Sequence, residues 1–131
     1  MSFLVDTNVL SELARRKVNP GVSRWAQSQF WVHLSAVTVE EVLFGLAWKQ
    51  NARLLEWFER FLAERVELLP VTGEIARASG WMRGRLQASG KTREQADMLI
   101  AGTASVHGLT LVTRNVSDFE QCGVALLNPF T

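Results

Sequence analysis

Aspartate is scarce in this 131-residue chain, which has only three aspartates beside ten glutamates. Asp6 follows the apolar residues 3–5 and opens a polar Asp-Thr-Asn triplet. An aspartate there is a good helix N-cap, because its side-chain oxygen accepts a hydrogen bond from a free backbone N–H. It also follows a predicted strand, and open α/β sheets place their sites beyond the carboxyl ends of strands. Both interpretations of Asp6 are open at this point.

Asp97 is the most informative aspartate, because it lies in the nearly apolar stretch QADMLIAGTASVH. This stretch predicts a buried helix, in which Ile100, Ala101 and Ala104 surround the aspartate and leave no solvated face. A buried carboxylate without compensation costs on the order of several kcal/mol. Asp97 must therefore be paired, protonated or bound to a metal ion, and a buried arginine partner is the structural alternative.

Glu41 also has two interpretations. The spacing Thr38-x-x-Glu41 is that of a capping box, in which the two side chains satisfy backbone donors at a helix start. The same position would place Glu41 on the first turn of a helix that follows the second predicted strand, close to Asp6. Glu40 faces about 100° away on that helix, and we expect it to be closer to solvent.

Asp118 lies in TRNVSDF, where it and Asn115 could be ordinary turn residues. However, the predicted strands that end near residues 5, 34 and 112 each lead within a few residues to an acidic side chain. Four carboxylates in one crevice need a counter-charge. Mg²⁺ and Mn²⁺ prefer oxygen ligands, and such a cation activates water and neutralises charge on a phosphodiester. The pattern therefore predicts metal-dependent phosphodiester hydrolysis.

Alternating strands and helices would position these side chains. The predicted strands are residues 3–5, 30–34, 66–69, 109–113 and 124–128, and the predicted helices are residues 8–17, 21–29, 38–48, 53–64, 72–88 and 93–107. Strands separated by helices predict an α/β fold, with a parallel sheet flanked by helices on both faces. We expect a single domain over residues 1–131.

Composition narrows the setting of the protein. Cys122 is the only cysteine, so an internal disulfide is excluded. The sequence shows no basic leader and no run of about 18 apolar residues, so we expect no membrane span and a cytoplasmic protein. The net charge is +1, and eleven of the fourteen basic residues are arginines. Charge alone does not establish a nucleic-acid partner.

Four segments together resemble a known family. FLVDTNVLSEL, LSAVTVEEVLFG, DMLIAGTA and LVTRNVSDFE are similar, in order and spacing, to the motifs of PIN-domain ribonucleases. The likeness is greatest to bacterial VapC toxins and their FitB-like relatives, and it covers essentially the whole chain. The resemblance implies that four acidic residues are catalytic and bind the metal, namely Asp6, Glu41, Asp97 and Asp118. It also implies that Thr113 and Asn115 flank or support this site. The family varies at the fourth acidic position, where Asn115 could take part of the role of Asp118.

The resemblance also implies partners. It implies an RNA substrate and Mg²⁺ or Mn²⁺ as cofactor. It also implies inhibition by a small cognate antitoxin, and the protein would contact operator DNA only through that antitoxin. It further implies a homodimer. Large apolar side chains in the first half exceed what one small core requires, which favours an interface as well. These residues are Leu43, Phe44, Leu46, Leu54, Leu55, Trp57, Phe58 and Phe61.

Aromatic and basic side chains allow weaker expectations. We expect most of the five tryptophans in the core or at a dimer interface. These are Trp25, Trp31, Trp48, Trp57 and Trp81. Four arginines could contact RNA phosphates, although solvated helix faces or antitoxin contacts explain them equally well. These are Arg77, Arg83, Arg85 and Arg93.

Two other functions are alternatives. A phosphatase could use Asp6 as a nucleophile, because an aspartate after the first strand can form a phospho-enzyme. Such enzymes usually carry a second aspartate two residues later, where this chain has Asn8. A catalytically inactive PIN-like module that binds RNA is the other alternative, and the complete acidic set argues against it.

Overall fold

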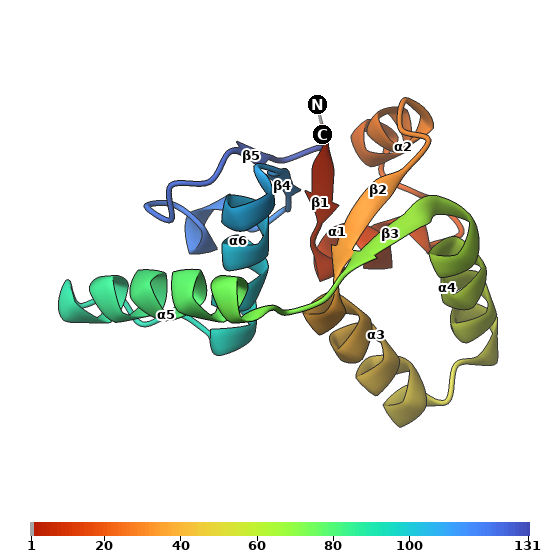
Figure 1. Cartoon of the computed structure of the whole chain (residues 1–131). Helices are drawn as coiled ribbons and strands as arrows, with labels where there is room; N and C mark the ends of the chain where they lie inside the picture. Colours follow the sequence, from red (N-terminus) through yellow and green to blue (C-terminus); the bar gives the residue numbers. More distant parts are fainter. Residues whose placement is uncertain (1) are drawn as a thin grey trace.

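A parallel five-stranded sheet organises the computed structural model, which describes residues 2–131 (Figure 1). Its strands are β1 (Phe3–Val5), β2 (Val32–Ser35), β3 (Val66–Leu69), β4 (Thr110–Val112) and β5 (Leu126–Leu127). The strand order is β3-β2-β1-β4-β5, and every neighbouring pair is parallel. This confirms the predicted α/β fold and makes β1, which precedes Asp6, the central strand.

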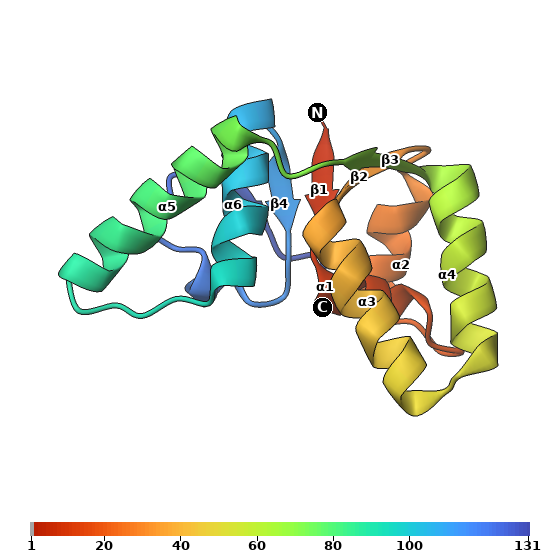
Figure 2. The same cartoon turned by 60° about the horizontal axis from the view of Figure 1, so that its bottom comes forward.

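Helices cover both faces of the sheet. They are α1 (Thr7–Leu13), α2 (Pro20–Gln27), α3 (Ala36–Lys49), α4 (Ala52–Arg65), α5 (Gly73–Ala88) and α6 (Gln95–His107), with a short 3₁₀ turn η1 (Val116–Asp118). Figure 2 shows α5 and α6 on one side of β1 and β4, and α1 to α4 on the other. Each face of the sheet therefore has its own hydrophobic core.

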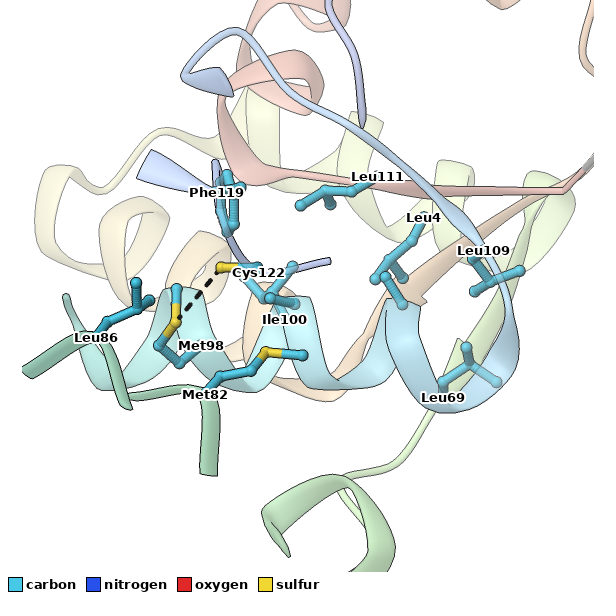
Figure 3. Close-up of a cluster of buried hydrophobic side chains, with 12 residues drawn as sticks. Leu4, Leu69, Met82, Leu86, Met98, Ile100, Leu109, Leu111, Phe119 and Cys122 are labelled. Carbon is cyan, nitrogen blue, oxygen red and sulfur yellow. Dashed lines mark hydrogen bonds between the residues drawn. The ribbon is translucent and has the colours of Figure 1, made fainter. Parts of the chain in front are cut away.

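The alternation of side chains along β1 feeds these two cores. Leu4 points into the cluster beneath α5 and α6, where it joins Ile100 and Leu111 (Figure 3). Phe3 and Val5, on the opposite face, join the cluster beneath α1 to α4. Successive residues of a strand point to opposite faces, so a three-residue strand can anchor both cores.

Several predicted boundaries are wrong by two residues or more, and three of them show why. The helix predicted over residues 8–17 ends at Leu13, because the Glu12 carboxylate accepts a hydrogen bond from the Asn19 backbone N–H at 2.8 Å and the intervening chain turns. The strand predicted from residue 30 begins at Val32, its first residue paired with β3. The helix predicted from residue 93 begins two residues later, at Gln95. No helix in residues 2–131 has the length and hydropathy needed to cross a bilayer.

The structure confirms a core position for two of the five tryptophans and leaves an interface position for the others as a prediction. Trp31, Trp48 and Trp81 are 53%, 77% and 67% exposed, so they do not belong to the core. Trp25 and Trp57 are half-buried and pack against the cluster beneath α1 to α4. Hydrophobic side chains predict burial only on average, because apolar atoms also make up much of a folded protein's surface.

Candidate active site

Asp6 lies where β1 ends and α1 begins, and it is only 5% exposed. Its Oδ1 accepts a hydrogen bond from the Thr7 backbone N–H at 2.8 Å, so Asp6 is the N-cap of α1. Its own N–H donates to the Val112 carbonyl at 2.9 Å, which ties it to β4. The structural role of Asp6 as a cap is therefore compatible with its place at the carboxyl edge of the sheet, and the two interpretations do not exclude each other.

Thr113 holds the second oxygen of Asp6. Its hydroxyl donates to Asp6 Oδ2 at 2.8 Å and accepts hydrogen bonds from the Asn115 backbone N–H at 3.0 Å and from Asn8 Nδ2 at 3.4 Å. A hydroxyl offers one donor and two acceptor lone pairs, so all three are used here. Thr113 is fully buried, and these bonds fix the Asp6 carboxylate in one orientation.

Asn8 is a site neighbour that the sequence analysis did not select. Its Nδ2 donates to Asp6 Oδ2 at 3.2 Å, while its Oδ1 accepts a hydrogen bond from the Arg114 backbone N–H at 3.1 Å. The amide thus joins α1 to the segment that follows β4. The signal was present in the Asp-Thr-Asn triplet, because a polar side chain on the first turn after a strand faces the same edge of the sheet.

Glu41 lies on the second turn of α3 and is half-buried. It was expected on the first turn, but the helix begins two residues earlier than predicted. The capping-box interpretation is wrong, because Ser35 is the N-cap and its Oγ accepts a hydrogen bond from the Val37 backbone N–H. Thr38 lies inside the helix with a buried, unpaired hydroxyl. Glu41 Oε1 instead accepts a hydrogen bond from Thr7 Oγ1 at 3.1 Å.

Thr7 is consequently a bridge between two carboxylates. Its backbone N–H binds Asp6 and its hydroxyl binds Glu41, so both acidic side chains converge on one residue. Glu40, the neighbour of Glu41, is exposed as predicted. Burial raises the pKa of Glu41, the Thr7 hydrogen bond lowers it, and the charges of Asp6 and Glu40 raise it further.

Asp97 lies on the first turn of α6, where the prediction of complete burial is wrong. The middle of the helix is buried as expected, but Asp97 itself is half-buried because it stands at the helix end that faces the carboxyl edge of the sheet. Burial raises its pKa from 3.8 to about 6, and the charges of Asp6, Asp118 and Glu41 contribute to the rise. The four predicted carboxylates therefore share one electrostatic environment.

Asp118 ends η1 and is half-buried. Its backbone N–H donates to the Asn115 carbonyl at 3.0 Å, which gives Asn115 a turn-forming role. Arg93 Nε donates to the Asp118 carbonyl at 3.1 Å, so this arginine holds the backbone of the turn from the side of α6. Arg93 is half-buried, whereas the other three arginines of its predicted group are exposed on α5. These are Arg77, Arg83 and Arg85.

Within the described residues 2–131, no basic side chain forms an ion pair with any of the four carboxylates. The ion pairs within residues 2–131 are Arg15–Glu12 and Arg60–Glu56, and the His33 ring lies 3.6 Å from the Glu67 carboxylate. Burial also raises the pKa of Asp6, although hydrogen bonds from Thr113, Thr7 and Asn8 oppose it. The buried-arginine alternative for Asp97 is therefore wrong, and the negative charge of the cluster is left for a cation from solution.

The four carboxylates suit a hard divalent cation, because every atom that they offer as a metal ligand is an oxygen. Within residues 2–131, no three acidic, histidine or cysteine side chains stand close enough to enclose a metal ion directly. Mg²⁺ dehydrates reluctantly and commonly keeps several waters while one or two carboxylates bind it directly. The arrangement of the four carboxylates therefore fits a hydrated cation, and not a closed protein cage.

Comparison with known proteins agrees with the fold. The PIN domain family matches residues 3–123. The VapC ribonuclease Y4jK of Sinorhizobium fredii is 33% identical, over 98% of this chain and 97% of that protein. Toxin FitB of Neisseria gonorrhoeae is 34% identical, over 98% of each chain.

A solved structure extends the likeness to three dimensions. The crystal structure of FitAcB from Neisseria gonorrhoeae contains a chain that matches with a TM-score of 0.84 at 33% identity, and the match covers 97% of each chain. The sequence similarity and the structural similarity thus both extend over nearly the full length of the chain. The chain belongs to the PIN-domain family, within the group of VapC and FitB toxins.

Proposed function

We propose that the protein is a metal-dependent endoribonuclease and the toxin of a type II toxin–antitoxin pair. The single observation that carries the enzymatic part is the convergence of Asp6, Glu41 and Asp97 with Asp118 without a basic partner. Membership of a group whose members include a VapC ribonuclease supplies the substrate class, RNA. We expect the protein to act on RNA in the cytoplasm.

The residues would divide the work as follows. Asp6, Glu41, Asp97 and Asp118 would hold Mg²⁺ or Mn²⁺, directly or through its waters. When bound, the cation would activate water for in-line attack and neutralise charge on the phosphodiester oxygens. Thr113 and Asn8 orient the Asp6 carboxylate, and Thr7 orients that of Glu41. Asn115 would support the site through its turn with Asp118.

A small antitoxin would inhibit the enzyme, and operator DNA would be contacted only through that partner. The similarity of the chain to the FitAcB crystal structure and to toxin FitB supports the proposal of an antitoxin partner.

We also propose a homodimer. Of the apolar side chains that predict one, Phe58 is in the core, at 1% exposure, whereas Phe44 and Leu55 are 68% and 41% exposed, and Trp48 nearby is 77% exposed. Exposed large apolar side chains of this kind mark interaction surfaces. Light scattering at micromolar concentration should report a dimer, and a monomer alone would contradict it.

The test of the enzymatic proposal is cleavage of RNA by the purified chain with Mg²⁺, with Mn²⁺ and with a chelator. We expect cleavage with the metals only, and loss of cleavage in a folded Asp97→Asn variant. Mapping RNA ends in cells that express the chain with and without its neighbouring small gene would identify the substrate. Wild-type cleavage by Asp97→Asn would contradict the proposed site.

The phosphatase alternative has less support. Both Asp6 oxygens accept hydrogen bonds, and the position two residues later holds an amide that binds one of them. Trapping of an aspartyl-phosphate would favour a phosphatase. RNA affinity without any cleavage in Mn²⁺ would favour an inactive binding module.

A further inference from the structure

A hollow of about 220 Å³ opens at the far end of α1 from Asp6. The residues that matter for its chemistry are Glu12, Arg15, Lys17, Asn19, Arg114 and Phe130. Arg15, Lys17 and Arg114 are exposed, so three cationic side chains line an open concave surface. We call this surface the basic groove.

One residue of the basic groove, Arg114, adjoins the residues that hold Asp6. Arg114 directly follows Thr113, whose hydroxyl holds Asp6, and its backbone N–H is bound by Asn8, which also holds Asp6. At 1.5 Å per helical residue, Glu12 lies about 9 Å from Asp6 along α1. This length corresponds to roughly two or three nucleotides at 3.4 Å each.

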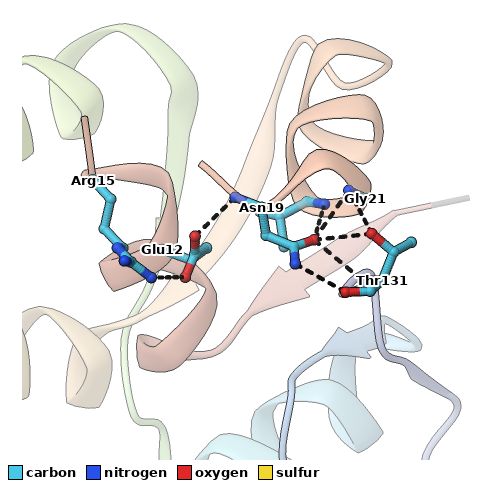
Figure 4. A network of polar contacts seen from close by, with 6 residues as sticks. Glu12, Arg15, Asn19, Gly21 and Thr131 are labelled. Carbon is cyan, nitrogen blue, oxygen red and sulfur yellow. Dashed lines mark hydrogen bonds and ion pairs between the residues drawn. The ribbon is translucent and has the colours of Figure 1, made fainter. Parts of the chain in front are cut away.

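The one acidic side chain in the basic groove is already occupied. Glu12 is 7% exposed, and its two oxygens accept hydrogen bonds from Arg15 Nη1 at 3.2 Å and from the Asn19 backbone N–H at 2.8 Å (Figure 4). Within residues 2–131, Lys17 and Arg114 form no ion pair. The groove therefore has a net positive charge, and two of its cations are available to a ligand.

The groove is also held in place. The Arg114 guanidinium lies over the Phe130 ring at 4.7 Å, an arrangement that favours a cation electrostatically. The next residue, Thr131, exchanges hydrogen bonds with the Asn19 side chain, as Figure 4 shows. A charged side chain held in this way loses little conformational entropy when it binds an anion.

Four carboxylates repel a polyanion, so an RNA strand needs neighbouring positive charge to reach them. We infer that the basic groove binds the phosphates of the RNA strand beside the cleaved bond, with Lys17 and Arg114 as phosphate-contacting residues. This inference rests on the proposed ribonuclease function and adds the path of the substrate to it. The occupant is a single-stranded RNA, because the groove is positively charged and its Arg114 adjoins Thr113 and Asn8 of the site proposed to cut RNA.

The test compares Lys17→Gln/Arg114→Gln with Lys49→Gln/Arg24→Gln, which removes the same charges at exposed positions on α3 and α2. Both pairs are placed in the Asp6→Asn background, with chelator, and titrated against a short fluorescein-labelled single-stranded RNA at several salt concentrations. Each lost phosphate contact makes the slope of log K against log[salt], where K is the RNA association constant, less steep by about 0.7. The groove pair should therefore make the slope less steep by about 1.4, and the control pair should leave it unchanged.

Cleavage kinetics separate this inference from the proposed function. In the otherwise wild-type chain, the groove pair should raise KM and leave kcat nearly unchanged, because it removes binding and not chemistry. Absence of cleavage by the wild-type chain would count against the function itself. Wild-type cleavage with equal salt slopes for the two pairs would overturn the groove alone. Unchanged RNA binding with weaker binding to the co-expressed antitoxin would overturn it too, and would assign the surface to the protein partner.

Discussion

The two ends of α1 each carry a buried carboxylate, and the two have opposite surroundings. Asp6 at the N-terminal end is 5% exposed and Glu12 at the C-terminal end is 7% exposed. A backbone N–H and an arginine bind Glu12, and these contacts lower its pKa. Asp6 has neutral donors only, other carboxylates nearby, and a raised pKa.

This difference shows why burial alone does not identify a site. A buried acid with a cationic partner has its charge compensated by the fold, and its role is structural. A buried acid among other acids has its charge uncompensated, which is the arrangement found where proteins bind cations or do chemistry. Electrostatic surroundings therefore distinguish two side chains that burial and helix position make alike.

The strongest test of this comparison exchanges each charge for an amide of the same size. Asp6→Asn should lower RNA cleavage by more than about 100-fold, because loss of a residue that only orients a metal ligand costs about 10–100-fold and this change removes a proposed ligand. Circular dichroism should show a folded domain, since asparagine is also a good N-cap. Wild-type cleavage by folded Asp6→Asn would end the distinction between the two ends.

Glu41 sharpens the same contrast on α3. Glu41→Gln should weaken Mn²⁺ binding, measured by calorimetry, and lower cleavage sharply, because it removes charge from the cation site. The stability in chelator should change by no more than about 1 kcal/mol, because glutamine can still accept the Thr7 hydrogen bond. Glu40→Gln is the matched control, and a loss confined to that variant would mean that the other glutamate is the ligand.

Glu12→Gln should give the reverse pattern. We expect unchanged Mn²⁺ binding and a domain less stable by about 1 kcal/mol near pH 7, since the ion pair with the largely exposed Arg15 is lost. The pKa of Glu12 is held below 4.5 by the hydrogen bond from Asn19, so this stabilisation is present above that value and is lost as the pH falls. Weaker Mn²⁺ binding in this variant would contradict the structural role.

The smallest effect concerns Asp97 without metal. Its pKa rises from 3.8 to about 6 on folding, so protonation favours the fold at low pH and that gain is lost as the pH rises through about 6. In chelator at about pH 7.5, Asp97→Asn should be more stable than the wild type by about 1 kcal/mol, after allowance for solvent screening. At about pH 3, below both pKa values, thermal melts of the two should coincide.

Much of the fold was predictable from periodicity and turn chemistry. The parallel α/β arrangement, the five strands and the six helices follow from alternating apolar runs and breakers, and Gly108 ends α6 with a φ of 65°, as a C-cap glycine does. The errors fall at boundaries such as Leu13, where the Glu12 side chain bonds to the backbone N–H of Asn19, beyond the helix. Such contacts depend on tertiary structure, which local patterns do not encode.

The acidic residues were predicted from scarcity and strand ends, and the family resemblance added Thr113 and Asn115 as supporting residues, but the contacts of Thr7 and Asn8 were not predicted. Spacing suggested that Thr38 and Glu41 cap one helix, whereas Ser35 caps it and Glu41 bonds to Thr7 on another element. The sequence pointed to Asn8 only because it stands where a phosphatase would carry a second aspartate. Glu41 and its partner Thr7 are 34 residues apart in the sequence. They meet because of the order of the strands in the sheet, which the sequence alone did not predict.

That strand order has a consequence for the newly made chain. Thr113 meets Asp6 across 107 residues, and central β1 has β4 as one of its neighbours. At roughly 5–20 residues per second, a ribosome needs about 5 to 20 s to add the residues between them. During that interval Asp6 lacks the hydroxyl that orients it, and Asp97 and Asp118 are also made late. A ribosome-bound fragment that ends before Thr113 therefore has no assembled acidic cluster.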